Sequence, residues 1–409
     1  MRAYERLLRY VAFDTASDPE SSTCPSTEKQ KLLGAELVRE MKEMGIGDAV
    51  MDEHGYVYGT IPASVGCEKA PVIGFIAHMD TVCEVPHADI KARVVPYDGG
   101  ELTLNTERGI VLSSSDFPEL AKYAGKELVV TDGTTLLGAD DKAGVAEILT
   151  MAEMLLSDST IRHGTVKIGF TPDEEIGRGA DLFDVPGFGA DFAYTVDGGA
   201  FGAVEYENFN AASMKVIVTG KNIHPGTAKN KMINAMLVAM EYNAMLPPVE
   251  RPEHTEMYEG FYHITSMYGS VEHAELGYIL RDHDLQKLED KKTFARNAAE
   301  YLNGIYGDNT VVLEIRDSYR NMDAVVKQHW HLIENARKAI ETVGGKPVTM
   351  PVRGGTDGAK LCYKGLPCPN LGTGGGNFHG RLEYACVQSM DQCAASLAEI
   401  AKLYGAMAR

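Results

Sequence analysis

The sequence predicts an α/β fold, a sandwich around a mostly parallel central sheet with a smaller ferredoxin-like α+β domain inserted into it. Segments of helical and strand periodicity alternate over residues 1–200, which is typical of a parallel sheet covered by helices. From about residue 211 the expected order changes to β-α-β-β-α-β, a unit that can close into a small domain of its own. Helical patterns resume after Asp323. We therefore expect a discontinuous large domain, 1–207 and 321–409, and an inserted domain, 208–320.

The expected elements of the large domain follow from hydrophobic periodicity. A helix over 28–45 places its leucines on one stripe and ends at a glycine suited to a left-handed cap. Residues 71–77, PVIGFIA, form a continuous apolar run typical of a strand buried on both faces. Further strands are expected at 56–61, 165–170 and 192–196, helices at 144–156, 324–343 and 388–404, and a long excursion away from the sheet over 84–130, which is rich in Pro, Gly and charge.

The inserted domain is expected to contain two helices packed on four strands. The strands are predicted at 211–219, 261–269, 275–281 and 310–316, and the helices at 231–246 and 285–303.

Composition excludes several classes of protein. Of 409 residues, 44% are hydrophobic and 24% charged, the usual mixture of a folded globular protein. The formal net charge of −19 repels phosphate backbones and anionic lipid, so we expect neither nucleic acid nor membrane as a partner. No apolar stretch is long enough to span a bilayer, and the N-terminus lacks the pattern of a signal peptide, so we expect a cytoplasmic protein. The seven cysteines show no C-x-x-C spacing and are expected to be free thiols.

Acidic and imidazole side chains stand where the buried strands end. Each alone has an ordinary interpretation as a helix cap, a turn former or part of a solvated face. Their succession, mostly after apolar strands, favours a shared site, because ligands of open α/β sheets bind at the carboxyl ends of the strands. The residues are His78 and Asp80 in HMD, Asp140 and Asp141 in GADDKAG, Glu174 and Glu175 in TPDEE, Asp197 ending FAYTVD, and His379 in GGGNFHG.

So many carboxylates in one crevice predict bound cations, because unpaired buried charges are costly. Imidazole and carboxylate without thiolate suit zinc, or less specifically cobalt or manganese. The set is too large for one tetrahedral ion but suffices for two ions that share a bridging carboxylate. One carboxylate must then remain free of metal to take the proton of the attacking water.

Eight motifs resemble the peptidase T family of tripeptide aminopeptidases, within the dizinc aminoacylase and carboxypeptidase superfamily. The resemblance runs nearly end to end and includes EGFYH at 259–263. The motifs are HMDT at 78–81, GADDKAG at 138–144, TPDEE at 171–175, YTVDGG at 194–199, NIHPGTAKN at 222–230, RGGTDGAKL at 353–361, and GLPCPNL with FHG near 379.

The resemblance implies a role for each residue of the site. Asp140 would bridge two zinc ions, His78 and Asp197 would complete one metal site, and Glu175 and His379 the other. Asp80 would hold the imidazole of His78, and Glu174 would be the general base that takes a proton from water and returns it to the leaving amine. A cis peptide bond is expected between Asp140 and Asp141, and the inserted domain would be a lid or dimerisation domain.

The resemblance also implies two substrate-binding residues, and the sequence offers Arg281 as a further candidate; each has a structural alternative. His224 would reach the developing oxyanion, the alternative being a loop imidazole that faces solvent. Arg353 would bind the substrate carboxylate, the alternative being an ion pair within the large domain. Arg281 is a third candidate, with an ordinary salt bridge as its alternative.

We therefore expect a zinc metallopeptidase that hydrolyses the first peptide bond of tripeptides. An alternative keeps the metals but changes the substrate to dipeptides or N-acyl amino acids, as in other members of the superfamily. A catalytically silent scaffold would require a missing ligand or base, and none is missing. The sequence leaves a monomer and a homodimer open.

Overall fold

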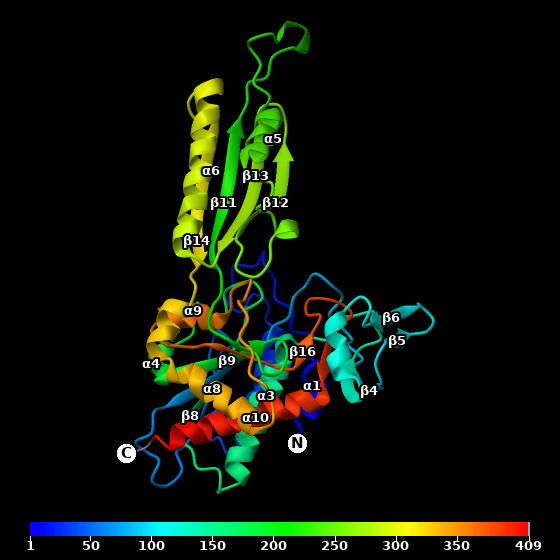
Figure 1. Cartoon of the computed structure of the whole chain (residues 1–409), viewed down its shortest axis with the longest axis vertical. Coiled ribbons are helices and arrows are strands. Elements are labelled where there is room, and N and C mark those ends of the chain that lie inside the picture. Colours follow the sequence, from blue (N-terminus) through cyan, green and yellow to red (C-terminus); the bar gives the residue numbers. More distant parts are fainter. Residues whose placement is uncertain (408–409) are drawn as a thin grey trace. The chain divides into compact units, whose positions relative to one another are not determined.

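The structure is a computed structural model that describes residues 1–407, and it contains two compact units. The first unit comprises Met1–Tyr206, Ala324–Met350 and Thr356–Arg409, and the second comprises Glu207–Asp323 and Pro351–Gly355. Figure 1 shows both units and labels many of their elements. Within residues 1–407, no helix combines the length and apolar character needed to cross a membrane.

Among the described residues, the main sheet of the first unit has the order β1-β2-β8-β3-β9-β15-β10. The inner strands β8, β3, β9 and β15 run parallel, and β1, β2 and β10 are antiparallel additions at the two edges. Every residue of β3 is buried, as its continuous apolar run predicts. The strands are β1 (Val50–Met51), β2 (Val57–Ile61), β3 (Ile73–His78), β8 (Val166–Thr171), β9 (Phe192–Gly198), β10 (Val204–Glu205) and β15 (Asn370–Gly372).

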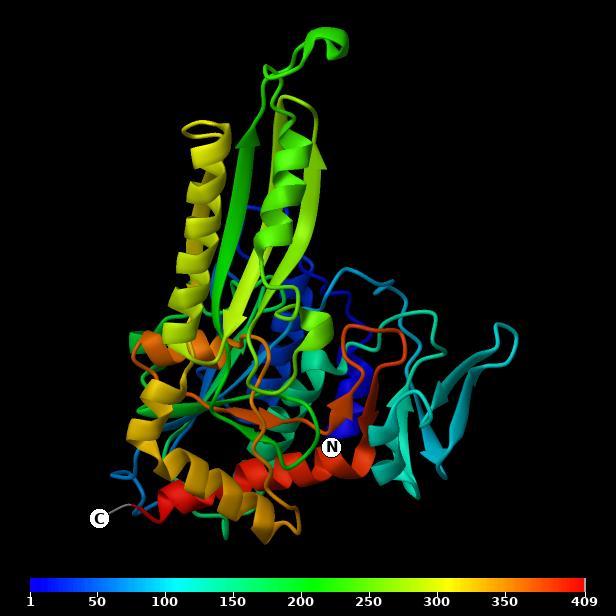
Figure 2. The ribbon, with the colours of Figure 1, turned by 45° about the horizontal axis from the view of Figure 1, so that its top comes forward.

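Helices cover both faces of this sheet. On one face α3 packs on β3 and β9, α10 contacts both α3 and α8, and Figure 2 shows α10 in red beside α8. On the other face, the ring of Phe188 in α4 lies where a Cβ on Gly74 of β3 would stand, so only glycine permits this close approach. The helices are α1 (Ala3–Tyr10), α2 (Gln30–Glu43), α3 (Ala139–Ser157), α4 (Val185–Phe188), α7 (Asp323–Val326), α8 (His331–Thr342), α9 (Asp357–Tyr363) and α10 (Val387–Gly405).

Residues 84–130 leave the main sheet, as expected, but they form regular structure of their own. Strands β4 (Arg93–Tyr97) and β7 (Lys126–Val130) pair with β16 (Gly375–Gly376) and β17 (Tyr384–Cys386) in the order β16-β17-β7-β4. A hairpin of β5 (Glu101–Asn105) and β6 (Ile110–Ser113) and the 3-10 helix Pro118–Tyr123 lie between β4 and β7. This second sheet anchors both ends of the loop that carries His379.

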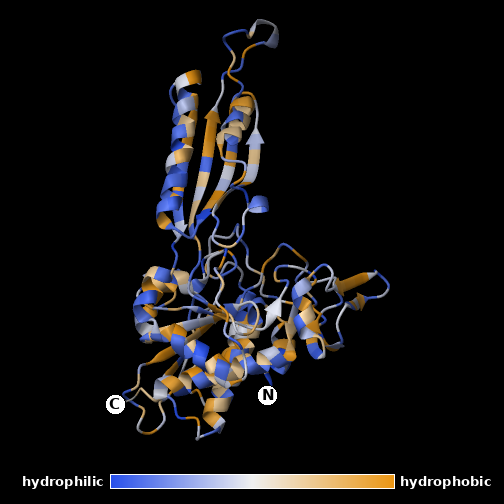
Figure 3. Ribbon diagram, viewed as in Figure 1, coloured by the Kyte–Doolittle hydropathy of each residue, from blue (hydrophilic) through white to orange (hydrophobic). Residues whose placement is uncertain are grey.

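The second unit is ferredoxin-like. Its antiparallel sheet has the order β12-β13-β11-β14, and α5 and α6 pack on it to form a core of its own. Figure 3 shows hydrophobic and hydrophilic residues mixed along α6, as in an amphipathic helix. The elements are β11 (Asn210–Thr219), α5 (Ala235–Met245), β12 (Phe261–Gly269), β13 (His273–Asp282), α6 (Leu285–Tyr306) and β14 (Val311–Tyr319), with 3-10 turns at Pro225–Thr227 and Pro252–His254.

Both parts of the predicted fold class are confirmed by this architecture. One helix begins later than its periodicity suggests, because the Asn234 side chain accepts a hydrogen bond from the Met236 amide and caps α5 there. Ile233, just before it, instead forms a β-bridge with Lys221.

Candidate metal centre

The predicted metal-site residues come from five separate elements of the first unit. His78 is the last residue of β3, Asp197 lies near the end of β9, and Glu175 follows β8. Asp140 lies at the start of α3, and His379 lies between β16 and β17. The carboxyl ends of the parallel strands supply three of these residues, His78, Glu175 and Asp197, as the sequence predicts.

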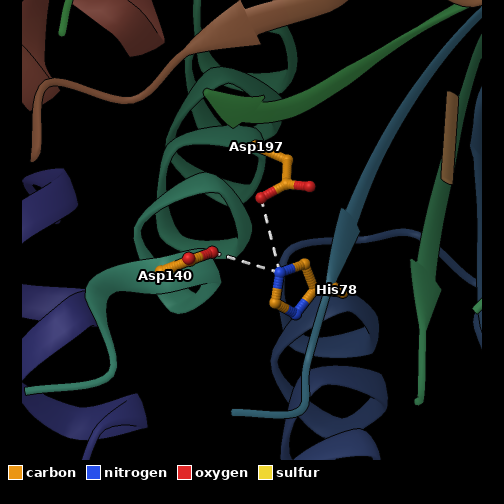
Figure 4. A group of neighbouring side chains, drawn as sticks. All are labelled: His78, Asp140 and Asp197. Carbon is orange, nitrogen blue, oxygen red and sulfur yellow. Dashed lines mark hydrogen bonds and ion pairs between the residues drawn. The ribbon is translucent and has the colours of Figure 1, made fainter. Parts of the chain in front are cut away.

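His78, Asp140 and Asp197 form a first group of possible ligands. The Nε2 atom of His78 lies 3.2 Å from Oδ1 of Asp140 and 3.4 Å from Oδ1 of Asp197. Figure 4 shows both carboxylates directed at this imidazole nitrogen. One ligand atom from each residue lies within 4.8 Å of the others, a spacing that could hold a metal ion.

Asp140, Glu175 and His379 form a second such group. The Nε2 atom of His379 lies 3.1 Å from Oδ2 of Asp140 and 3.0 Å from Oε2 of Glu175. Asp140 therefore directs Oδ1 to one group and Oδ2 to the other. A carboxylate shared in this way is the arrangement that joins two metal ions in binuclear hydrolytic sites.

The buried carboxylates of the two groups would be stabilised by added positive charge. Burial raises the pKa of Asp197 to about 6 and that of Glu175 to about 7. Hydrogen bonds to Asp140 and Glu175 raise the pKa of His379 to about 11, so protonated imidazole balances the carboxylates where no ion is bound. Glu175 Oε1 is buried and has no hydrogen-bond partner among the described residues. The imidazole nitrogens and carboxylate oxygens of the two groups are ligands that suit a divalent cation, which would neutralise the carboxylates in place of an imidazole proton.

Asp80 links the end of β3 to the turn that follows β8, and its side chain is fully buried. Its two oxygens accept hydrogen bonds from the backbone amides of Glu174 and Glu175, at 2.9 and 3.1 Å. The Nδ1 atom of His78 lies 3.5 Å from Asp80 Oδ1 and 3.1 Å from the Asp80 carbonyl oxygen. Asp80 thus fixes the imidazole on one side and the turn of the adjacent glutamates on the other.

Glu174 belongs to neither group of possible ligands. Burial raises the pKa of Glu174 well above its usual value, and the nearby charge of Asp197 adds to the effect. A carboxyl group whose pKa is raised in this way binds a proton more readily than an exposed one, which suits a group that must accept a proton and later release it.

Comparison with known proteins places the chain in a family. Residues 127–403 match the family described as Peptidase family M20/M25/M40. A protein called peptidase T from Alkaliphilus oremlandii is 53% identical over 402 residues, which cover 98% of each chain. The chain belongs to peptidase family M20/M25/M40. The predicted resemblance to the peptidase T family is confirmed, and the chain is a metallopeptidase.

Two solved structures share the fold. Crystal structures of the aminopeptidase PepT from Bacillus cereus and of a tripeptidase from Staphylococcus aureus match with TM-scores of 0.77 and 0.78, at 24% and 21% identity. Each match covers 98% or 99% of this chain and 98% of the other.

Three acidic residues that sequence reasoning left without a role support this M20 site. Glu383 accepts hydrogen bonds from the backbone amides of Leu137, Gly138 and Asp140, at 3.0, 2.7 and 2.9 Å. It lies in the same loop as His379, so it ties that loop to the start of α3. The other two are Asp141, which accepts from the amides of His78 and Gly144, and Asp357, which accepts from the Thr171 hydroxyl.

No local pattern in the sequence indicates the role of Glu383, because its partners are backbone amides of a distant segment. The peptide bond between Asp140 and Asp141 is cis, as the resemblance implies.

The three predicted substrate-binding residues all belong to the second unit. His224 is exposed, and its Nδ1 atom accepts a hydrogen bond from the Gly226 amide. Arg281 lies over the ring of Tyr319 and makes no ion pair among the described residues. The ordinary salt bridge considered for Arg281 is therefore absent from residues 1–407.

Arg353 is held by a loop of the second unit. Its Nη1 atom donates to the carbonyl oxygens of Met257 and Glu259, and its Nη2 atom donates to Thr255 Oγ1, at 2.9–3.0 Å. The guanidinium also lies over the rings of Phe209 and Phe261. These contacts differ from the ion pair within the large domain that was the alternative for Arg353.

Proposed function

We propose that this chain is a tripeptide aminopeptidase that uses two divalent metal ions, zinc being the first candidate and cobalt or manganese possible substitutes. The observation that carries the proposal is the division of the Asp140 oxygens between two groups of ligands. His78 and Asp197 would hold one ion with Asp140, and Glu175 and His379 would hold the other. The names of the related proteins, peptidase T, aminopeptidase and tripeptidase, support the substrate class.

Bound ions would supply activation of a water molecule and polarisation of the scissile carbonyl group. Glu174 would accept a proton from that water and then donate it to the nitrogen of the leaving amine. Its raised pKa and its separation from both ligand groups support this role. Asp80 would act indirectly, by orienting His78 and the backbone of Glu174.

Arg353 would bind the carboxylate of the substrate. The loop of the second unit uses both Nη1 donors and one Nη2 donor, so Nε and the remaining Nη2 donor are left on one edge of the guanidinium. Such an edge matches the two oxygens of a carboxylate. Arg281 stands opposite Phe261 in the strand register, next to the ring on which Arg353 packs. We propose that Arg281 adds charge to the same site and that His224 assists at the carbonyl oxygen.

A substrate series tests this proposal on the metal-loaded enzyme. We expect cleavage of tripeptides with both ends free, and at least about 100-fold lower kcat/KM for dipeptides and for N-acetylated tripeptides, because each lacks a recognised group or misplaces it. The products should be a free amino acid and a dipeptide, identified by mass spectrometry. Efficient hydrolysis of N-acyl amino acids instead would favour the alternative substrate class and overturn the proposal.

A further inference from the structure

An aminopeptidase must recognise the α-ammonium group of its substrate, and the residue that does so has no assignment yet. A carboxylate is the natural partner of an ammonium group. The proposed metal ligands and the proposed base are committed to other roles. Other acidic residues near the ligands are Asp80, Asp141, Asp357 and Glu383, which are at most 4% exposed and accept structural hydrogen bonds. They are closed to a substrate group.

Glu205 differs from these residues because its side chain is partly exposed and half of its carboxylate is free. It is the last residue of β10, the edge strand of the main sheet, and stands opposite Asn370 of β15. Asn370 Nδ2 donates to Glu205 Oε2 at 2.8 Å. Among the described residues, no hydrogen bond reaches Oε1 of Glu205. This atom is not fully buried, so solvent can reach it.

Asn370 also places Glu205 close to the metal ligands. While its Nδ2 atom binds Glu205, its Oδ1 atom accepts a hydrogen bond from the backbone amide of Asp197 at 3.2 Å. Asn370 is 1% exposed, so its amide group is held firmly between the two acidic residues. The carboxylate of Glu205 is therefore two hydrogen bonds away from a residue of the first ligand group.

The charge of Glu205 is uncompensated. No Lys or Arg of residues 1–407 forms an ion pair with it, and the charged group that acts on it is Asp197, which is also acidic. Burial raises the pKa of Glu205 to about 7. A cationic group bound beside Oε1 would stabilise the charged form of this carboxylate, since an opposite charge nearby favours ionisation.

We propose that Glu205 binds the α-ammonium group of the peptide substrate and so selects peptides with a free amino terminus. The inference rests on the proposed aminopeptidase function and assigns the specificity for the amino end to one side chain. Asn370 is the residue that positions Glu205.

The test compares Glu205→Gln with the wild-type enzyme, both loaded with metal. Glutamine keeps an oxygen that accepts from Asn370 but removes the charge. We expect KM for a tripeptide to rise about 10- to 100-fold, the usual loss for a hydrogen bond between charged groups, with kcat within threefold. We expect no change in the inhibition constant of a tripeptide analogue whose amino group is replaced by hydrogen, because that analogue makes no use of the Glu205 charge.

The matched control is Glu53→Gln, in the turn before β2 at the opposite edge of the same sheet. The side chain of Glu53 is 88% exposed, and its substitution should leave all constants unchanged. Metal content, measured by elemental analysis, should be equal in the three proteins. Glu205→Asp keeps the charge, but its side chain is one methylene shorter and moves the carboxylate away from the ammonium group, so KM should also rise.

Two results would overturn the assignment. One is a KM for Glu205→Gln within twofold of the wild-type value. The other is loss of metal or an equal loss of affinity for the analogue without an amino group, which would mean that Glu205 acts on the Asp197 site and not on the substrate. A wild-type enzyme that fails to cleave tripeptides would instead refute the proposed function, and this inference with it.

Discussion

Substitution of Glu174→Gln is expected to lower kcat for tripeptides by about 10²- to 10⁴-fold, the usual contribution of a general acid–base group. Glutamine has nearly the same shape but cannot take a proton from water or return one to the leaving amine. Because Glu174 stands outside both groups of possible ligands, the variant should bind metal as the wild-type enzyme does. Steady-state kinetics and elemental analysis of the same preparation measure the two effects.

The exposed Glu53→Gln variant is again the control for the chemical change alone. A Glu174→Gln enzyme that kept a kcat within tenfold of the wild-type value would show that another group moves the proton. A variant that lost its metal would place Glu174 among the ligands and not at the base position.

Substitution of Asp140→Asn is expected to weaken binding of both metal ions, because one side chain serves both ligand groups. The amide retains one oxygen and loses the negative charge, and we expect metal affinity to fall by more than about 100-fold and tripeptide cleavage to be lost. Titration of the metal-free protein, followed by calorimetry, measures the number of ions bound and their affinity.

His379→Ala provides the contrast to Asp140→Asn. It removes a ligand from the second group only, so His78, Asp140 and Asp197 should still bind one ion. If Asp140→Asn bound two ions with wild-type affinity, Asp140 would not be shared and the site would need a different arrangement.

Most of the fold was predictable from the sequence because the helices and strands follow local patterns of hydrophobic residues. The apolar run before His78 indicated a strand buried on both faces, and the change of order after residue 211 indicated the ferredoxin-like unit. The strands within 84–130 were missed, because β7 pairs with β17, which lies far along the chain and has only three residues. Such pairing depends on long-range contacts that local periodicity does not contain.

Residues of the candidate site that directly follow predicted strands could be found from the sequence. Residues that are held by groups of distant segments could not. His78 and Asp197 were found because parallel strands end at one edge. Glu383 and Glu205 were not, since their surroundings are backbone amides and an asparagine from distant segments. Arg353 lies within the predicted large-domain range 321–409 but belongs to the second unit, because its donors are satisfied by carbonyl oxygens of that unit.

The metal content of the fully active enzyme tests the central claim most directly. Elemental analysis should find two divalent ions per chain, and chelation should abolish tripeptide cleavage. Addition of zinc, cobalt or manganese to the metal-free protein should restore cleavage in proportion to the fraction of chains that hold a second ion. The acidic groups around Asp140 would then be neutralised as their burial requires. A preparation that cleaves tripeptides at its full rate after all divalent ions have been removed would contradict this account.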